Sequence, residues 1–440
     1  MAYKRRYNTS FGDIGFDVSQ RWPEKDIIAA KGRTKNTVGL ALSGGGYRSA
    51  IFNYGVLKGL HKLDVIPKID YLSVVSGGSW IGMPFSTATD LGFLFHKTDD
   101  HPNLMEEGFE SLLPNPGRVA QEMALARRSA NYVSNIYGRL LARTFLREHG
   151  DKGRTSPLSD ATLFDDQERP FLIVNGTANF RRPKTFDITQ ECFEMTRLYS
   201  GSHSLGYLAT DELKATERKI RIRDAIAISG AEVALHIPGL GDDVGGFGLS
   251  REIVNFAKGR PDASTRTPQN DEVDVADGGH YNNLGVESLI NRGCRYIIIV
   301  DAEHDPEAKT ETRSNQKYSG LNKLLDRIHI PLPNISRPRL DAANQAVHEF
   351  QGTAKKPSIL YIKLKSMKKF DALAKKKPYN GPNFLENLFD RGAFRFDPQF
   401  STAKLDYDFA EHRNLSELGE YIVTKEGKGQ VIKKFVNQAS

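Results

Sequence analysis

The amino-acid sequence predicts a three-layer α/β domain with a mainly parallel central sheet and a helical insertion. Residues 38–79 are predicted to form a strand, a glycine-rich turn, a helix and a second strand, all within roughly forty residues. Parallel strands need such a crossover, which is usually a helix, so this unit predicts a parallel sheet. Further apolar segments of strand length recur at 171–174 and 296–300. The 440 residues can bury a large core, and the composition is globular, with 39% hydrophobic and 26% charged residues.

The first βαβ unit follows from the local pattern of apolar residues. Residues 38–42 (VGLAL) form an apolar run of buried-strand length, and residues 70–75 (DYLSVV) form a second. Between them the apolar residues recur with helical spacing, and Pro67 is expected to end this helix. Its apolar positions are Phe52, Val56, Leu60 and Leu63.

Residues 86–165 break the alternation and are expected to form the helical insertion. Apolar residues at helical spacing run from Val119 to Leu141, and arginines interleave with them. The pattern favours a helix that packs by one face and is solvated on the other. A lid or a membrane-facing element stays open as the alternative. The interleaved arginines are Arg118, Arg127, Arg128, Arg139, Arg143 and Arg147.

The rest of the chain adds strands and a final helix. Residues 222–228 fit either a strand or the start of a helix. The other expected elements are strands at 171–174, 296–300 and 360–364, a loop over 365–395 and a helix over 407–423. We therefore expect an N-terminal arm over 1–36, one domain over 37–423 and a C-terminal tail over 424–440.

Charge and cysteine content narrow the class of protein. The net charge of +7 and the pI near 9.1 fit anionic lipid head groups, nucleic acid or an ordinary solvated surface. The two cysteines, Cys192 and Cys294, lack metal-ligand spacing and argue against a disulfide scaffold, so a cytoplasmic location is expected. No apolar run reaches the ~18 residues of a membrane-spanning helix, and no signal peptide is visible at the start.

The first local signal for chemistry is the loop SGGGYR at residues 43–48. It lies where a strand turns into a helix, and its glycines leave backbone N–H groups uncovered. The helix start behind them adds positive potential, which suits a phosphate or an oxyanion. The loop lacks the Lys-Ser/Thr of a P-loop and the spacing of G-x-G-x-x-G, and a tight structural turn is the alternative.

The second signal is VVSGG, residues 74–78, which places Ser76 between a strand and a small-residue helix start. This is the arrangement of a nucleophile elbow, which exposes a serine hydroxyl at the edge of a sheet. The usual pattern is G-x-S-x-G, and Val74 stands in the position of its first glycine, so looser packing is expected before the elbow. Ser79 is a rival nucleophile, one helical turn further on.

The third signal is Asp277-Gly278-Gly279, which follows the apolar alternation of Val273 and Val275. Asp277 is therefore expected at a strand end. A serine nucleophile needs a base, for which histidine is the usual choice. His280 and His304 are the available candidates, although neither lies in a recognisable triad context.

These three motifs in this order resemble the patatin-like phospholipases. SGGGYRSA, VVSGGSW about thirty residues on, and ADGGHYNNLG far downstream carry the resemblance. The GGG-x-R loop and SGGSW also resemble the group IV cytosolic phospholipases. ILYIKLK and FDPQFSTAKLDYDFAEHRNLSELGEYIV are similar to C-terminal parts of large bacterial patatin-like proteins. The resemblance covers residues 37–423 and implies a patatin-like phospholipase domain there.

The resemblance implies a lipid acyl hydrolase of phospholipase A type, acting on glycerophospholipid esters without metal or cofactor. Ser76 would be the nucleophile and Asp277 the general base, with an acyl-enzyme intermediate. The oxyanion would be held by N–H groups of Gly44, Gly45 and Gly46. Arg48 would hold the lipid phosphate, its alternative being a structural ion pair.

The expected partner is a phospholipid membrane surface, bound peripherally from the cytoplasm. Nucleic acid is not expected as a partner, and a homo-oligomer stays open. Two other functions also stay open. One is a histidine-dependent serine esterase, and the other is a catalytically inert module that binds membranes or nucleic acid.

Overall fold

A computed structural model gives the fold of the chain. It describes residues 22–32, 36–95, 130–165, 168–181, 188–203, 205–215, 218–232, 251–254, 272–305, 319–326, 330–336, 339–340, 345–367, 370, 398–401, 407, 409–425 and 427–439.

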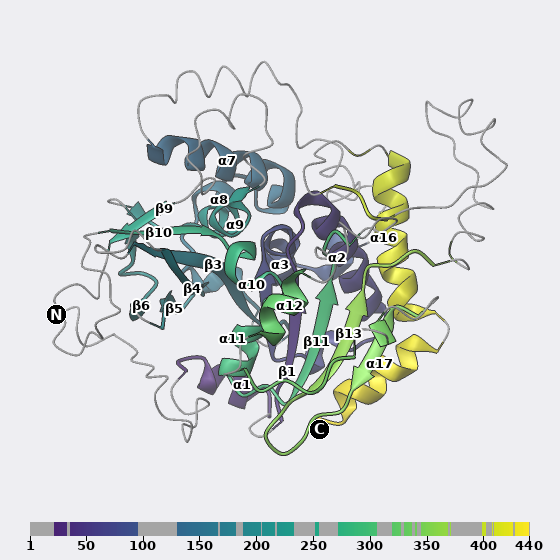
Figure 1. The fold of residues 1–440 in the computed structure, drawn as a ribbon. Coiled ribbons are helices and arrows are strands. Elements are labelled where there is room, and N and C mark those ends of the chain that lie inside the picture. The colour runs from purple at the N-terminus through teal and green to yellow at the C-terminus, as the bar shows by residue number, and fades with distance from the viewer. Residues whose placement is uncertain are drawn as a thin grey trace.

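An eleven-stranded sheet forms the centre of the domain (Figure 1). Its middle strands run parallel in the order β13-β11-β1-β2-β3. This parallel centre confirms the expected sheet. The five strands are β1 (Val38–Leu42), β2 (Tyr71–Val75), β3 (Phe171–Arg181), β11 (Tyr296–Asp301) and β13 (Ser358–Lys363).

Antiparallel strands extend the sheet on both sides. β12 (Val347–Phe350) pairs with β13 at one edge. On the other side β3 pairs with β4 (Ile188–Met195), followed by β5 (Tyr199–Ser202) and β6 (Gly206–Ala209). β3 also pairs with β10 (Glu272–Asp277), which in turn pairs with β9 (Arg251–Val254). β7 (Lys214–Ala215) and β8 (Arg218–Lys219) form a separate two-stranded sheet.

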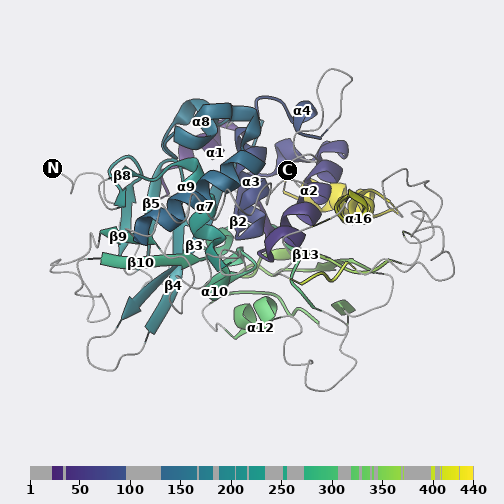
Figure 2. The same ribbon diagram turned by 90° about the horizontal axis from the view of Figure 1, so that it is seen from above.

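Helices cover both faces of the sheet, which confirms the three layers (Figure 2). Alternate residues of β11 show why: Ile298 and Val300 join one buried cluster, whereas Ile297 and Ile299 join the other. The first face carries α2 (Gly46–Lys62), α3 (Gly77–Thr87), α7 (Ala130–Phe145), α9 (Ile222–Ser229) and α16 (Phe409–Thr424). The second face carries α10 (Gly279–Asn282) and α12 (Ser319–Leu325), and also α11 (Val286–Asn291), whose Val286 and Leu289 join the second buried cluster. Shorter elements are α1 (Lys25–Ala30), η3 (Ile66–Lys68), α4 (Leu91–Phe95), η4 (Arg147–His149), α8 (Gly150–Thr155) and η5 (Ala161–Leu163).

Helix α2 confirms the predicted helix but ends before the predicted stop. It finishes at Lys62, and Asp64 takes a left-handed conformation with φ 55°. Aspartate tolerates this region because its short polar side chain can hydrogen-bond locally. Pro67 instead lies within the short helix η3. The local turn at Asp64 therefore ends α2, and the proline does not.

The described part of the insertion contains α7, whose predicted start lies outside the described residues. Leu141 and Phe145 are buried, whereas Arg139 and Arg143 are exposed. The Tyr137 hydroxyl donates a hydrogen bond of 2.7 Å to the Gly230 carbonyl, just after α9. This part of α7 packs by one face, as the first interpretation of its pattern predicts.

The C-terminal region differs from the expected tail. Residues 222–228 are helical, within α9, and 407–423 correspond to α16, but a further helix, α17 (Lys428–Asn437), follows. Gly427, with φ 76°, allows the chain to turn between α16 and α17. Ile432, Phe435 and Val436 of α17 are buried in the main core. Most of the expected 365–395 loop lies outside the described residues.

The expected N-terminal arm is also part of the domain from residue 22. Glu24 is buried and lies 2.8 Å from Arg292, whose guanidinium stacks 4.1 Å over the Trp22 ring. Arg292 also pairs with Glu194 at 2.8 Å, so Trp22 and Glu24 join the segment to a buried ion-pair cluster of the domain.

Candidate active site

Two strands meeting head to head on β3 bring Ser76 and Asp277 together. β2 runs parallel to β3 as far as the pair Val75–Asn175. β10 runs along the same side of β3 in the opposite direction and ends at the pair Asp277–Gly176. The carboxyl ends of β2 and β10 therefore meet at adjacent residues of β3. The Ser76 Oγ donates a hydrogen bond of 3.2 Å to the Asp277 Oδ2.

Ser76 lies in a sharp, strained turn between β2 and α3. Its φ of 49° and ψ of −124° are unusual for a residue with a side chain, and such strain costs about 1–3 kcal/mol. A Cβ on Gly77 would lie 2.0 Å from the Gly46 carbonyl oxygen, so only glycine permits this close approach. Ser79, the rival nucleophile, donates its hydroxyl to the Ser76 carbonyl at 2.6 Å and is fully buried.

Val74 does not loosen the packing before the elbow, contrary to the sequence expectation. It is fully buried, and Gly82 of α3 faces it. A Cβ on Gly82 would lie 2.5 Å from the Val74 Cγ1. Val74 stands where the usual elbow has its first glycine, and Gly82 on the facing helix provides the space that the valine side chain needs.

Asp277 is held in place by main-chain donors. Its Oδ1 accepts from the Gly279 N–H at 2.8 Å, and its Oδ2 accepts from the Glu232 N–H at 3.0 Å. Burial raises the pKa of Asp277 to about 7; the Gly279 N–H opposes this shift, and the Glu232 carboxylate adds to it. A carboxyl with a pKa near neutrality can exchange a proton with a serine hydroxyl.

The three glycines of the loop differ in whether their N–H groups already donate a hydrogen bond, and the sequence does not show this difference. The Gly44 N–H donates to the Asn283 carbonyl at 2.9 Å, so it is already engaged. Gly45 and Gly46 have φ values of 133° and 61°, and Gly46 begins α2. The described hydrogen bonds of the loop include none donated by the N–H of Gly45 or Gly46. These two groups are therefore the donors that the loop can offer to an oxyanion.

Arg48 is fully buried beside this loop. Its Nε donates to the Ala302 carbonyl at 3.0 Å, and its Nη1 donates to the Phe400 carbonyl. Burial lowers the pKa of Arg48. This geometry favours a structural role, and the phosphate-binding role stays a prediction.

The two candidate histidines contact other groups. The His280 Nε2 lies 3.8 Å from the Glu232 carboxylate, and the His304 Nδ1 lies 3.1 Å from the Phe400 carbonyl. The described hydrogen bonds of Ser76 and Asp277 include none to a histidine.

Ser229, Asn283 and Thr177 support the site and were missed from the sequence. The Ser76 N–H donates to the Ser229 Oγ at 2.9 Å, and the Thr177 hydroxyl donates to the Asp277 carbonyl at 2.7 Å. Asn283 belongs to the ADGGHYNNLG run, so its neighbourhood was identified. Ser229 and Thr177 carry no local signal, because only the tertiary fold brings them to the site.

Three buried carboxylates, Asp301, Glu303 and Asp305, lie close enough together to suggest a metal site. The Lys363 ammonium, however, donates to Asp301 at 2.8 Å and also to Asp305. A protein cation thus already pairs with two of the three carboxylates, and we assign no metal to the cluster.

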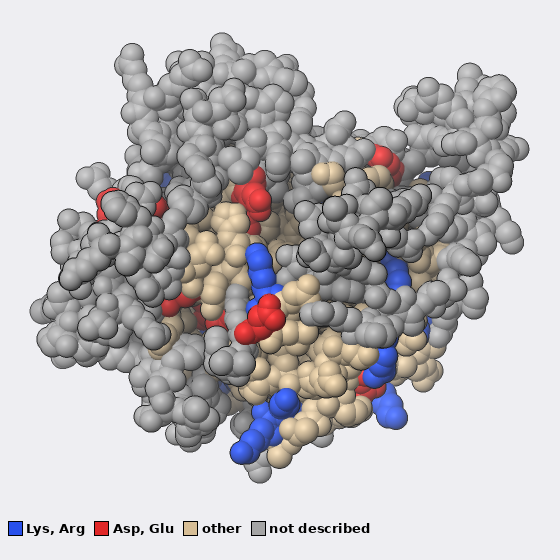
Figure 3. Space-filling view, viewed as in Figure 1, with Lys and Arg blue, Asp and Glu red and all other residues tan. Residues whose placement is uncertain are grey.

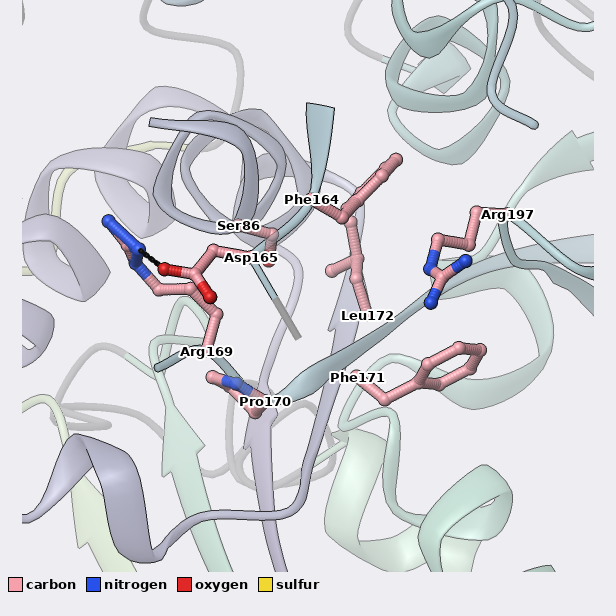
Figure 4. Close-up of a pocket in the computed structure, with 8 residues that line it drawn as sticks. All are labelled: Ser86, Phe164, Asp165, Arg169, Pro170, Phe171, Leu172 and Arg197. Atoms are coloured by element: carbon pink, nitrogen blue, oxygen red, sulfur yellow. Dashed lines mark ion pairs between the residues drawn. The ribbon is translucent and has the colours of Figure 1, made fainter. Parts of the chain in front are cut away.

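A small pocket at the start of β3 lies away from this chemistry (Figure 4). Arg169 and Asp165 form an ion pair of 3.8 Å on one side of it, and Arg197 lies over Phe171 on the other. Phe171 pairs with Tyr71 at the amino end of β2, whereas Ser76 follows its carboxyl end. The pocket therefore lies near the amino end of β2, whereas Ser76 lies at the carboxyl end of the same strand.

On the face seen in Figure 3, the described Lys and Arg residues lie in separate groups among uncharged and acidic residues and do not form one basic patch. Within the described ranges, the helices are all too short or too polar to cross a bilayer.

Comparisons with known proteins find similar sequences over part of the chain. Residues 38–211 match the family model "Lysophospholipase catalytic domain". Lysophospholipase 1 of Candida albicans is 25% identical over 207 residues, which span 40% of this chain and 33% of that protein. A lysophospholipase of Kluyveromyces lactis is 22% identical over 206 residues and 32% of its length. The matched part thus spans about a third of these relatives.

Among solved structures, human GIVD cytosolic phospholipase A2 has a similar fold. The TM-score is 0.65 at 16% identity, and the match covers 98% of this chain and 67% of that one. Residues 38–211 are thus similar to a lysophospholipase catalytic domain, and the fold of the chain is similar to that of human GIVD cytosolic phospholipase A2.

Proposed function

We propose that the chain hydrolyses acyl esters of glycerophospholipids or lysophospholipids, using Ser76 and Asp277 as a catalytic dyad. The observation that carries the proposal is the buried hydrogen bond of 3.2 Å between the Ser76 Oγ and the Asp277 Oδ2. The names of the fungal relatives and the human structure support lipid esters as the substrate class.

In the first half of the reaction, ionised Asp277 accepts the Ser76 proton as the Ser76 Oγ attacks the ester carbonyl. The oxyanion of the tetrahedral intermediate is stabilised by the N–H groups of Gly45 and Gly46, each typically worth ~3 kcal/mol. Collapse of the intermediate breaks the ester C–O bond, and protonated Asp277 returns its proton to the leaving alkoxide. The acyl group is then bound to Ser76 as an ester.

In the second half, Asp277 takes a proton from water, and the hydroxide attacks the acyl carbonyl. The same two N–H groups stabilise the second oxyanion. Collapse releases the fatty acid, and the Ser76 Oγ regains its proton from Asp277.

The substrate class also determines the proposed partner. Long-chain phospholipids reside in bilayers, so we propose peripheral binding to a membrane surface. A cytoplasmic location is proposed because the two cysteines, both of them buried, are not joined in a disulfide.

The test combines activity with covalent labelling. Ser76→Ala and Asp277→Asn should each remove nearly all hydrolysis of phospholipid vesicles, and the double variant should be scarcely worse, because members of one catalytic unit are not additive. Ser79→Ala is the matched control, and it should keep most of the activity because its hydroxyl only bonds the Ser76 carbonyl.

Methyl γ-linolenyl fluorophosphonate, a ligand of the human GIVD structure, is a suitable label. Attack by the Ser76 Oγ would expel fluoride and leave a stable phosphonate ester, which peptide mass spectrometry would locate. A label on another residue, or wild-type turnover by folded Ser76→Ala, would refute the dyad.

A further inference from the structure

Asn283 connects the two halves of the proposed site. Its carbonyl accepts the Gly44 N–H at 2.9 Å, and it follows α10, which begins two residues after Asp277. A Cβ on Gly44 would lie 2.2 Å from the Asn283 Oδ1 and 3.0 Å from the Ser76 Cβ. Gly44 is therefore wedged between Asn283 and the nucleophile, and any shift of Asn283 would move the loop that carries the oxyanion donors.

Glu303 in turn anchors the Asn283 side chain. The Glu303 Oε1 accepts from the Asn283 Nδ2 at 2.6 Å and from the Gly320 N–H at 2.9 Å. Glu303 is 6% exposed, so these hydrogen bonds are largely shielded from water. Burial raises the pKa of Glu303 to about 7, and in its ionised form the carboxylate makes charge-assisted bonds that are about twice as strong as neutral ones.

The main chain beside Glu303 holds the other end of the same loop. The Ala302 N–H donates to the Ser43 Oγ at 2.8 Å, and the Ala302 carbonyl accepts from Arg48. The Glu303 N–H donates to Asp301 at 2.9 Å, and Asp301 is paired with Lys363. This end of β11 is thus a rigid support for the glycine loop.

We propose that Glu303 is a positioning residue, which through Asn283 sets the Gly45 and Gly46 N–H groups against the Ser76 Oγ. This inference rests on the proposed function. It adds a residue, Glu303, that lies outside the sequence motifs containing Ser76 and Asp277. A glycine-rich loop needs such support because its backbone is conformationally permissive. An oxyanion exists only in the transition state and the intermediate, so misplacing its donors should lower kcat and leave KM nearly unchanged.

The experiment uses a soluble nitrophenyl ester, for which kcat and KM are measured separately. Glu303→Ala should lower kcat by about 10- to 100-fold, of the order expected for one weakened oxyanion donor, with KM within about twofold. Glu303→Gln should restore most of the rate, because its amide oxygen can still accept from Asn283. Asn283→Ala should match Glu303→Ala, and the double variant should be no worse, since both changes break one link.

Glu24→Ala is the matched control. Glu24 is also buried, and its described side-chain partners are Arg292 and Tyr199, neither of which belongs to the glycine loop. This variant should be destabilised but keep its kcat per labelled Ser76.

Three results would overturn the proposal. The first is an unchanged kcat in Glu303→Ala, and the second is an equal loss in Glu24→Ala, which would indicate general destabilisation. The third is a normal kcat in Asn283→Ala, which would mean that Glu303 acts through Gly320 and α12 instead. If Glu303→Ala does not fold, Asn283→Ala decides the question. Hydrolysis that persists in Ser76→Ala would instead contradict the dyad, so the two failures are distinguishable.

Discussion

The buried carboxyl of Asp277 links activity to stability, and this link can be measured. Its pKa rises from 3.8 to about 7 in the folded protein. The fold therefore favours the protonated form. This stabilisation is fully present at pH values below the pKa of Asp277 in the unfolded chain. It is lost as the pH rises through the pKa of Asp277 in the folded protein. One pKa unit corresponds to about 1.36 kcal/mol, so the total is roughly 4 kcal/mol, of which roughly 2.5 kcal/mol falls between about pH 5 and pH 8.

Asp277→Asn isolates this contribution because asparagine has no charge to lose or gain. The assay is urea denaturation of wild type and variant at several pH values. From about pH 5 to about pH 8, the wild type should lose roughly 2.5 kcal/mol of unfolding free energy relative to the variant. Other titrating groups are common to both proteins and cancel in the difference.

The rate of ester hydrolysis should show the opposite dependence. A general base must be ionised, so the rate should rise with pH and level off above about 7, the pKa of Asp277. A stability difference that does not change with pH would show that Asp277 is not a buried carboxyl with a raised pKa. A flat rate profile between about pH 5 and pH 8 would remove it as the base.

Three further predictions follow from the site. His280→Ala and His304→Ala should each keep most of the nitrophenyl ester activity, since neither ring contacts Ser76 or Asp277; a loss of about a thousandfold in one of them would favour the histidine-dependent esterase. Arg48→Ala should lower the turnover of phospholipid and of nitrophenyl ester alike if Arg48 supports the loop. A rate loss of about 10- to 100-fold that is confined to phospholipid would instead support phosphate binding by Arg48. Gly82→Ala should destabilise the protein by about 1–3 kcal/mol in thermal unfolding, because the new Cβ would lie 2.5 Å from Val74. Adding Val74→Gly to this variant should recover part of the lost stability. Additive effects of the two substitutions would contradict this packing.

Local pattern was enough to predict the centre of the fold. β1, α2 and β2 follow from apolar runs separated by glycine turns, and the position of Ser76 follows from the junction of β2 and α3. Asp277 was expected at a strand end and is the last residue of β10. In these segments the nearest neighbours in sequence decide the conformation, so periodicity carries the information.

The remaining features depend on contacts between distant segments. Nothing in residues 272–277 shows that β10 runs antiparallel to β3 and ends opposite Gly176. Arg48 was expected to face a ligand, but its partners Ala302 and Phe400 lie more than 250 residues away. The burial of Trp22 beside Arg292 is equally non-local. Such pairings are set by the tertiary fold, which a single sequence does not reveal.

The site concentrates features that oppose folding. Ser76 is strained by about 1–3 kcal/mol, and ionising buried Asp277 opposes folding by roughly 4 kcal/mol at high pH. Main-chain N–H groups of Gly279 and Glu232 and the hydroxyl of Ser229 partly offset these terms, because they replace the water that Asp277 and Ser76 lose. The Gly279 and Glu232 N–H groups are fixed before Asp277 ionises, so they stabilise the charged base without reorganisation of the site. The same hydrogen bonds that make the strained arrangement tolerable therefore also prepare it for the reaction.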